Sequence, residues 1–399
     1  MEYKFAKRVE GASLSAIRMV GEYAAGNPDF ILLSIGNPAY ETFPVERIKE
    51  MNMLVYETEA SCKAALQYGG GAGTDVFRNQ IKERLAKYKG IDMETNDIFI
   101  TSGSGPALDL MPLTFCEEGD VAFVEEFTYP GALSALKAAG VKAVGIQLDA
   151  DGLNLEDFEA KIKANPKGRY LYIIPTFSNP IGITYSLEKR KAIYELCQKY
   201  DLMIYEDDPY SELRFEGVEV PCMKSFDTDG RVVHAGSFSK VMAAGLRVGF
   251  VCADKGCVNK LSMCQGNRAA CTVMSQSIIS NFMSRYDFDQ HLEDIRAVYG
   301  KKAKLMKQCL DADLHPACVR TDPEGGMFIW VTMPEGTDGR AAFEACLKNN
   351  VGVVPSFGFS FDPENLPGRA FRLNYSAPTL EGIEKGVKRF CEVMHQFCS

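Results

Sequence analysis

The strongest constraint on the fold is an alternation of apolar, strand-like runs with helical segments between residues 97 and 252. Seven apolar runs occur there, at 97–101, 121–124, 143–148, 170–174, 202–205, 232–235 and 248–252. Helical segments lie between several of them, at 106–115, 130–139 and 186–200. Runs that are apolar throughout are typical of strands covered on both faces. We therefore predict an α/β fold with a mostly parallel sheet and helices on both of its faces.

The pattern changes after residue 252. A long helical stretch is predicted from about residue 256 to residue 310, with a break near Asp287. Apolar runs at 326–331, 351–355 and 370–375 and a closing helix at 380–398 then predict a smaller α+β domain. We divide the 399 residues into an N-terminal arm (1–45), a large domain (46–285) and a small C-terminal domain (286–399).

Composition excludes several classes of protein. Fifty-three acidic and 44 basic residues give a net charge of -9, which argues against a nucleic-acid surface. No apolar run reaches the length of a membrane span, and residues 1–5 lack the apolar segment of a signal peptide. Thirteen cysteines without a C-x-x-C pair, and only four histidines, predict buried thiols and no metal site. We therefore expect a cytoplasmic protein.

Polar side chains gather at the carboxyl ends of the predicted strands, which is where open α/β sheets bind ligands. They are Ser104, Tyr129, Asn179, Asp207, Tyr210, Ser237, Ser239, Lys240 and Arg247. A lysine whose pKa is lowered by burial or by neighbouring cations reacts with carbonyls, and the start of a helix binds phosphate. An amine, an anion, a phosphate cup and an aromatic ring together fit pyridoxal phosphate better than another cofactor.

Each of these residues also has an ordinary structural explanation. Ser104 alone could be a helix cap, Tyr129 a core aromatic and Asp207 a solvated charge. Their occurrence together, at consecutive strand ends, favours a binding site. The glycines of residues 69–73 do not have the G-x-G-x-x-G spacing, which argues against a dinucleotide site.

Three motifs carry a resemblance to a known family. They are Asn179-Pro180-x-Gly182, Asp207-x-x-Tyr210 and Ser237-x-Ser239-Lys240 followed by Arg247. As a set they resemble the signature of pyridoxal-phosphate aminotransferases of the aspartate aminotransferase fold, the type I fold of such transferases. Residues 206–210, 236–240 and 371–376 are most similar to the branch that contains 2-aminoadipate and kynurenine aminotransferases, with the aminotransferase-like domains of MocR-type regulators as close relatives. The resemblance covers roughly residues 30–395.

The resemblance implies a role for each residue of the site. Lys240 would hold the cofactor and move a proton at the substrate, Asp207 would pair with the pyridine nitrogen, and Tyr129 would stack on the ring. Asn179 and Tyr210 would bind the phenolic oxygen. The phosphate would be held by Ser104, Gly105, Ser237 and Arg247, with Ser239 in support and Tyr68 reaching in from the partner subunit of a homodimer.

The substrate would meet a second group of residues. Arg372 would bind its α-carboxylate, together with Asn179, and Gly36 would lie over it. Arg18 would meet a side-chain carboxylate, or else lie on an exposed helix face. Two departures from the branch are expected to affect binding: Gly105-Pro106 stands where relatives carry glutamine after the serine, and residues 36–38 differ from the usual Gly-Gly-Leu-Pro.

The predicted function is transfer of an amino group between an L-amino acid and a 2-oxo acid, in amino-acid metabolism. Glutamate and 2-oxoglutarate are the expected pair, with 2-aminoadipate or an aromatic or branched-chain amino acid as partner. Alternatives are a C–S lyase or a decarboxylase on the same fold, or a sensor that binds the cofactor without turnover. A MocR-type sensor would carry an N-terminal winged-helix domain, for which the roughly 30 residues before the first core strand are too few.

Overall fold

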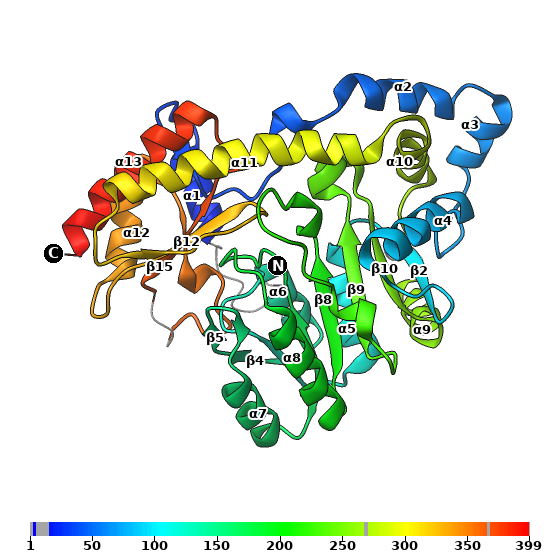
Figure 1. Cartoon of the computed structure of the whole chain (residues 1–399), viewed down its shortest axis with the longest axis horizontal. Coiled ribbons are helices and arrows are strands. Elements are labelled where there is room, and N and C mark those ends of the chain that lie inside the picture. The colour runs from blue at the N-terminus through cyan, green and yellow to red at the C-terminus, as the bar shows by residue number, and fades with distance from the viewer. Residues whose placement is uncertain (1–2, 5–15, 267–269, 365–367, 399) are drawn as a thin grey trace.

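The computed structural model describes residues 3–4, 16–266, 270–364 and 368–398, and a seven-stranded sheet lies at its centre (Figure 1). In spatial order the strands are β2 (Asn96–Thr101), β10 (Gly249–Asp254), β9 (Val232–Ser237), β8 (Met203–Asp208), β7 (Gly168–Ile173), β3 (Val121–Glu125) and β4 (Lys142–Ile146). Neighbours from β9 to β4 are parallel, which confirms the mostly parallel sheet.

Strand β10 is the exception, since it runs antiparallel to both β9 and β2. The reason is the short connection. Residues 238–248 form two short helical turns, whereas a parallel neighbour requires a crossover long enough to return the chain to the other end of the sheet. The connection therefore stays at the carboxyl end of β9, and Lys240 lies within it.

The sheet is buried on both faces. Along β7, Tyr172 packs with Tyr205 of β8 in one hydrophobic core, while Leu171 and Ile173 point into a second core under α7 (Leu155–Ala164) and α8 (Leu187–Lys199). Successive residues of a strand point to opposite faces, so only strands that are apolar throughout can supply both cores. This explains why polar side chains are displaced to the strand ends.

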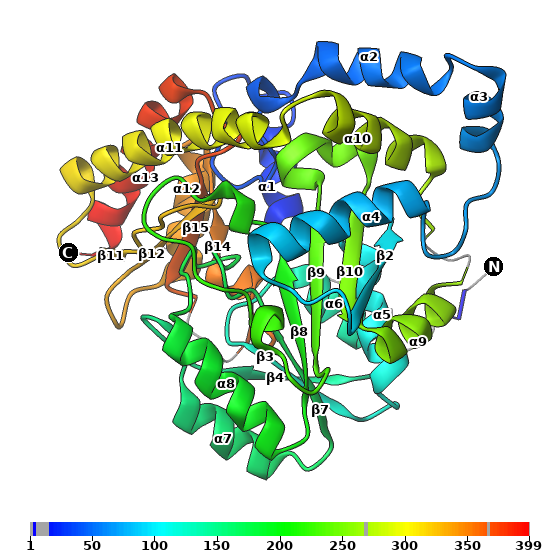
Figure 2. The same ribbon diagram turned by 45° about the vertical axis from the view of Figure 1, so that its right-hand side comes forward.

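Helices cover both faces of this sheet, and Figure 2 shows α4 crossing in front of β9 and β10 with α5 and α6 behind them. The helices assigned up to residue 285 are α1 (Ala16–Ala24), α2 (Val45–Val55), α3 (Glu59–Leu66), α4 (Asp75–Arg84), α5 (Gly105–Phe115), α6 (Pro130–Ala138), α7 (Leu155–Ala164), α8 (Leu187–Lys199), α9 (Lys255–Gln265) and α10 (Val273–Arg285). The predicted helical stretch from 256 to 310 thus has a second break, between α9 and α10, in addition to the one at Asp287. Within the described part, no helix combines the length and the apolar character needed to cross a bilayer.

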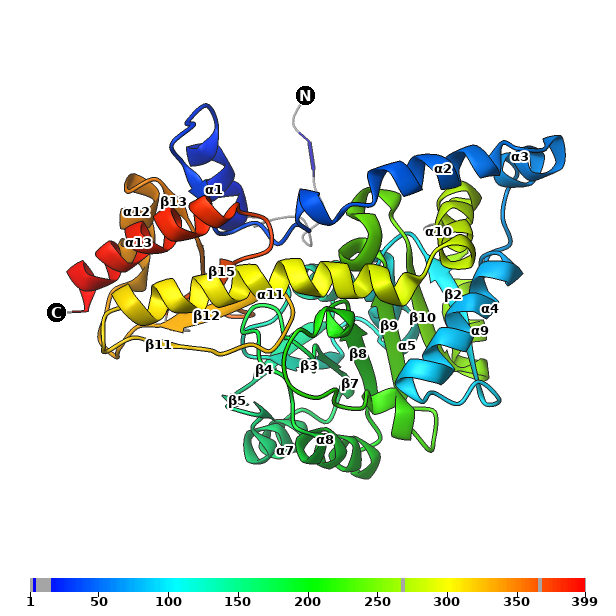
Figure 3. The same ribbon diagram turned by 45° about the horizontal axis from the view of Figure 1, so that its top comes forward.

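A smaller antiparallel sheet follows, in the spatial order β11 (Val319–Arg320), β12 (Phe328–Thr332), β15 (Ala370–Asn374) and β14 (Val354–Pro355). It packs with α12 (Gly339–Lys348) and α13 (Leu380–Phe397), and α1 lies on the same side (Figure 3). The long helix α11 (Phe288–Asp313) connects the two parts, because His291 bonds the carbonyl of Val241 and Lys302 donates to the carbonyl of Ser376. Elements of a smaller α+β unit are therefore present, and the domain limits at residues 45 and 285 stay a prediction.

The N-terminal segment is fixed to the C-terminal part of the chain. Strand β1 (Ile31–Leu32) pairs in parallel with β13 (Val351–Gly352), and the amide of Asn374 donates to the carbonyl of Leu33. Since β15 carries Arg372, this pairing brings residues 34–36 to the side chains at the carboxyl ends of the central strands. A short hairpin of β5 (Leu148–Asp149) and β6 (Gly152–Leu153) completes the strands assigned in the described part.

Candidate active site

Lys240 lies in the turn that follows β9. Its Nζ donates a hydrogen bond to the carbonyl oxygen of Gly36, at 2.7 Å. Burial is the main reason why the pKa of Lys240 is lowered to about 8, and the positive charges of Arg372 and Arg247 lower it further. An amine with this pKa is partly neutral near neutral pH, and a neutral amine is what attack on a carbonyl requires.

Asp207 lies near the carboxyl end of β8 as a buried carboxylate with one oxygen engaged and one free. Tyr172 donates from its hydroxyl to Oδ2 at 2.8 Å, whereas Oδ1 has no hydrogen-bond partner among the described residues. Burial is the main reason why the pKa of Asp207 is raised to about 7, and the neighbouring Asp208 raises it as well. A buried acceptor without a donor is unfavourable, so a ligand that brings an N–H group fits here.

Arg372 reaches this region from the small sheet. Its Nη1 donates to Oδ1 of Asn179 at 2.7 Å, and its Nη2 donates to the carbonyl of Ser34 at 2.6 Å. The amide nitrogen of Asn179 lies 3.4 Å from the hydroxyl of Tyr210. Arg372 therefore connects the N-terminal segment, the loop after β7 and the small sheet at one point.

Two aromatic rings lie close to the guanidinium of Arg372. Its Cζ lies 4.3 Å from the ring centroid of Phe328 and 4.8 Å from that of Phe359. Burial lowers the pKa of Arg372 to about 10, and Nε has no hydrogen-bond partner among the described residues. A flat cation that lies against aromatic rings and still has unpaired N–H groups is suited to a planar carboxylate.

The side chain of Arg247 and the start of α5 form a part of the site that is suited to an anion. Gly103 has a φ of +81°, and a Cβ there would lie 2.4 Å from Nη2 of Arg247, so only glycine allows this close approach. Arg247 in turn donates to the carbonyl of Ser102. Helix α5 begins at Gly105, and the side chain of Ser104 in the N-cap position makes no capping bond. Uncapped helix amides beside a guanidinium favour a phosphate.

Tyr129 lies close enough to Asp207, Arg247 and Arg372 for the charges of all three to affect its pKa. Burial is the main reason why its pKa is raised, the charge of Asp207 raises it further, and the charges of Arg247 and Arg372 oppose the shift.

In the loop before Lys240, the amide of Ser239 donates to Oγ of Ser237 at 3.1 Å, which fixes the backbone of that loop.

Two predicted site residues are not placed in this group. The side chain of Tyr68 is 98% exposed on the single chain and lies beside the glycine-rich loop. Arg18 belongs to α1, and its side chain lies outside the described part of the structure.

The chain matches a family model described as aminotransferase class I and II over residues 28–390. The chain belongs to the class I and II aminotransferases. It is 36% identical to aromatic-amino-acid aminotransferase 1 of Thermococcus litoralis over 400 residues, which cover 99% of this chain and 95% of that relative.

Solved aminotransferase structures have the same fold. The kynurenine aminotransferase of Pyrococcus horikoshii, determined with PMP, is 34% identical and superposes with a TM-score of 0.92 over 98% of this chain and 97% of that one. LysN, the α-aminoadipate aminotransferase of Thermus thermophilus, determined with a phosphopyridoxyl-leucine adduct, is 30% identical with a TM-score of 0.86 over 98% and 97%. The predicted type I fold is confirmed, and this aminotransferase depends on pyridoxal phosphate.

The residues of the site fit that cofactor on their own chemistry. The unpaired Oδ1 of Asp207 is an acceptor for a protonated ring nitrogen. The lowered pKa of Lys240 suits an amine that binds an aldehyde. Arg247 and the start of α5 provide the positive end that a phosphate requires.

Sequence reasoning missed several residues of this site. Tyr172, Phe328 and Phe359 lie in or beside apolar runs, where an aromatic residue is normally part of the core. Tyr205 and Asp207 are two residues apart on β8 and therefore share a face, but the position of Tyr172 opposite Tyr205 follows only from the register of β7 with β8.

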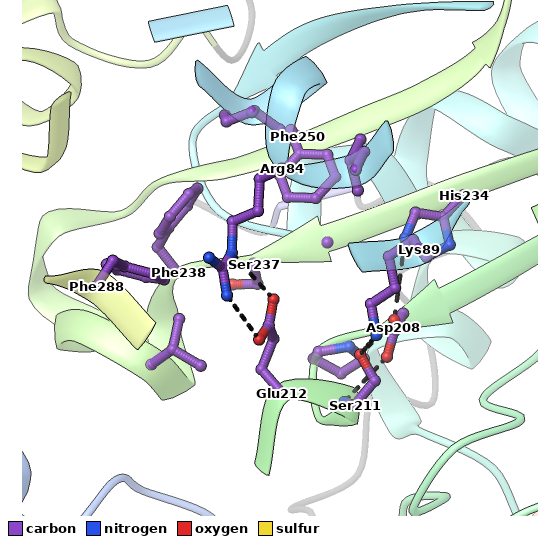
Figure 4. Close-up of a pocket in the computed structure, with 15 residues that line it drawn as sticks. Arg84, Lys89, Asp208, Ser211, Glu212, His234, Ser237, Phe238, Phe250 and Phe288 are labelled. Carbon is purple, nitrogen blue, oxygen red and sulfur yellow. Dashed lines mark hydrogen bonds and ion pairs between the residues drawn. The ribbon is translucent and has the colours of Figure 1, made fainter. Parts of the chain in front are cut away.

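The opposite face of β8 and β9 contains a separate cavity of about 50 Å³ (Figure 4). Its lining contains an ion pair, with Arg84 Nη2 3.1 Å from Glu212 Oε2, and a hydrogen bond that Lys89 donates to Oγ of Ser211 at 2.9 Å. Ser237 also lines this cavity, and the predicted contact of Ser237 with a phosphate stays a prediction.

Proposed function

We propose that this aminotransferase exchanges amino groups between glutamate/2-oxoglutarate and a second pair, with 2-aminoadipate or an aromatic or branched-chain amino acid as partner. The observation that carries the site assignment is that Lys240 and Asp207 both lie near Arg372, at the carboxyl ends of the central strands. The names of the relatives, which act on aromatic amino acids, kynurenine and α-aminoadipate, support the choice of partner.

Pyridoxal phosphate, when bound, supplies an aldehyde for the amino group and a ring that withdraws electrons from the substrate Cα. Lys240 accepts the Cα proton and returns a proton, and its partly neutral amine makes this transfer possible. Asp207 would hold the protonated ring nitrogen through Oδ1, which has no other partner among the described residues. Asn179 and Tyr210, which lie within 3.4 Å of each other, would donate to the phenolic oxygen.

The remaining residues bind and orient. Tyr129 would stack on the ring, and Arg247 and the helix amides at Ser104 and Gly105 would hold the phosphate. Ser237 would also bind the phosphate, and Ser239 would support the loop that carries Lys240.

Substrate recognition rests on Arg372. Its two hydrogen-bonded nitrogens and its contacts with the rings of Phe328 and Phe359 fix the plane of the guanidinium before a substrate arrives. Asn179, its partner in the protein, lies beside the same carboxylate. Gly36 limits the space above Lys240, and Arg18 remains the candidate for a side-chain carboxylate.

A panel of amino acids without an acceptor tests the reaction and its donor. We expect glutamate and at least one aromatic, branched-chain or aminoadipate donor to convert the bound cofactor to its amine form and to release the matching 2-oxo acid, followed by absorbance and by 2-oxo acid analysis. A C–S lyase would instead release pyruvate and ammonia with the cofactor unchanged, and a decarboxylase would release carbon dioxide. A sensor would show no turnover and would shift DNA in a gel, which would contradict the proposal. No release of 2-oxoglutarate from glutamate would remove glutamate as donor.

We also propose a homodimer with shared active sites and a cytoplasmic location. The almost fully exposed ring of Tyr68, beside a glycine-rich loop, is available to reach the phosphate of a second copy. All thirteen cysteines are free, which agrees with a reducing compartment.

Mixing two inactive variants tests the shared site. Lys240→Ala removes the lysine from its own site but leaves Tyr68 intact, and Tyr68→Ala does the reverse. If Tyr68 acts across the interface, hybrids of the two contain one complete site. Refolding the variants together should therefore give activity well above that of either variant alone, measured as transfer from glutamate. Activity equal to the mean of the two separate variants would place Tyr68 in its own subunit's site or in none.

A further inference from the structure

Tyr172 contacts Asp207 in a way that separates the two carboxylate oxygens. Its hydroxyl donates to Oδ2 at 2.8 Å, and Oδ1 is left buried without a partner among the described residues. Both side chains are buried, so water does not substitute freely for either contact. The donor thus selects which oxygen remains for a ligand.

The ring of Tyr172 is held in place by a second tyrosine. Tyr205 lies directly opposite it in the pairing of β7 with β8, with ring centroids 5.5 Å apart and planes 20° from parallel. Tyr205 is equally buried, but its hydroxyl has no hydrogen-bond partner in the described part of the chain. The two tyrosines are therefore alike in burial and stacking and differ in their contact with Asp207.

The surroundings of Asp207 make this hydrogen bond important. The titratable groups around it come from several elements: Tyr172 from β7, Tyr205 and Asp208 from β8, Tyr210 from the turn after β8, His234 from β9, Glu125 from β3 and Tyr129 from the start of α6. Burial and Asp208 favour the protonated form of Asp207, while the hydroxyl of Tyr172 and His234 favour the ionised form. Without the hydroxyl of Tyr172, burial and Asp208 would favour the protonated form of Asp207 more strongly.

We propose that Tyr172 is a positioning residue for the cofactor: its hydroxyl holds Oδ2 of Asp207, keeps the carboxylate ionised and leaves Oδ1 as the oxygen that receives the proton of the ring nitrogen. This inference rests on the proposed role of Asp207. It assigns to a residue inside an apolar strand a direct influence on cofactor affinity.

The experiment measures binding of pyridoxamine phosphate to the cofactor-free protein, since this probe forms no covalent bond with Lys240. Affinity is measured for wild type, Tyr172→Phe and Tyr205→Phe between about pH 6 and pH 9. The wild-type protein should lose affinity as the pH falls through about 7, where Asp207 takes up a proton. Tyr172→Phe should bind roughly 10-fold more weakly at neutral pH, with the pH midpoint moved upward. Tyr205→Phe should behave as wild type.

Two results would overturn the inference: an unchanged affinity and midpoint in Tyr172→Phe, or an equal loss in Tyr205→Phe, which would indicate packing instead. Adding Tyr172→Phe to Asp207→Asn should cost little further affinity, and a fully additive loss would also contradict it. If Asp207→Asn alone bound the probe as wild type does, the failure would lie in the proposed role of Asp207 rather than in that of Tyr172.

Discussion

Replacing Lys240 with alanine should lower the turnover number for amino-group transfer by roughly 10²–10⁴-fold. The amine of Lys240 is buried, and its pKa of about 8 leaves it partly neutral, so it can both accept a proton and bind an aldehyde. Alanine supplies neither function, and no other lysine is hydrogen-bonded to Gly36 in the described part of the chain. The measurement is steady-state release of 2-oxoglutarate from glutamate with a 2-oxo acid acceptor.

Two further variants separate chemistry from charge. Lys240→Arg keeps the positive charge but cannot lose a proton near neutral pH, so it should be as inactive as alanine. Lys260→Ala, at an exposed position on α9, should retain wild-type turnover. Borohydride reduction followed by peptide mass analysis should find the cofactor attached at Lys240 in the wild-type protein. Full multiple-turnover activity in Lys240→Ala would overturn the assignment of the whole site.

Much of the large sheet was predictable because its strands are buried on both faces. Residues 170–173 of β7 are buried and apolar at every position, and this makes the strand visible in the sequence together with the polar residues that follow it. The register between neighbouring strands produces no comparable pattern in the sequence. The antiparallel direction of β10 and the pairing of β1 with β13 depend on contacts between distant segments, and neither was predicted.

The same distinction applies to the site. Asp207, Lys240 and Asn179 were predicted because charged or amide groups at the ends of apolar strands need an explanation. Tyr172 and Phe328 were missed because an aromatic residue in an apolar run needs none. Their contribution comes from position: one donates to Asp207 and the other lies against the guanidinium of Arg372, and both relations exist only in the folded chain.

Replacing Arg372 with lysine should lower kcat/KM for amino acids by roughly 10–100-fold, which is the loss expected for one hydrogen bond to a charged group. Lysine keeps the positive charge but cannot present two parallel N–H groups to a carboxylate. It also cannot replace both existing contacts, to Asn179 and to the carbonyl of Ser34, or fill the space between Phe328 and Phe359. The expected effect lies mainly in KM for the amino acid and for the 2-oxo acid, measured in separate half-reactions.

The role of Arg372 can be separated from a general loss of structure. Arg389→Lys serves as the control, because Arg389 on α13 donates to the carbonyls of Asp29 and Asn350 in the same part of the molecule. It should leave both half-reactions unchanged. A primary amine that lacks the α-carboxylate should react equally slowly with wild type and with Arg372→Lys, because the arginine has no carboxylate to bind. If the variant instead slowed the amine and the amino acid by the same factor, Arg372 would act by holding Asn179 and the N-terminal segment in place, and the substrate carboxylate would bind elsewhere.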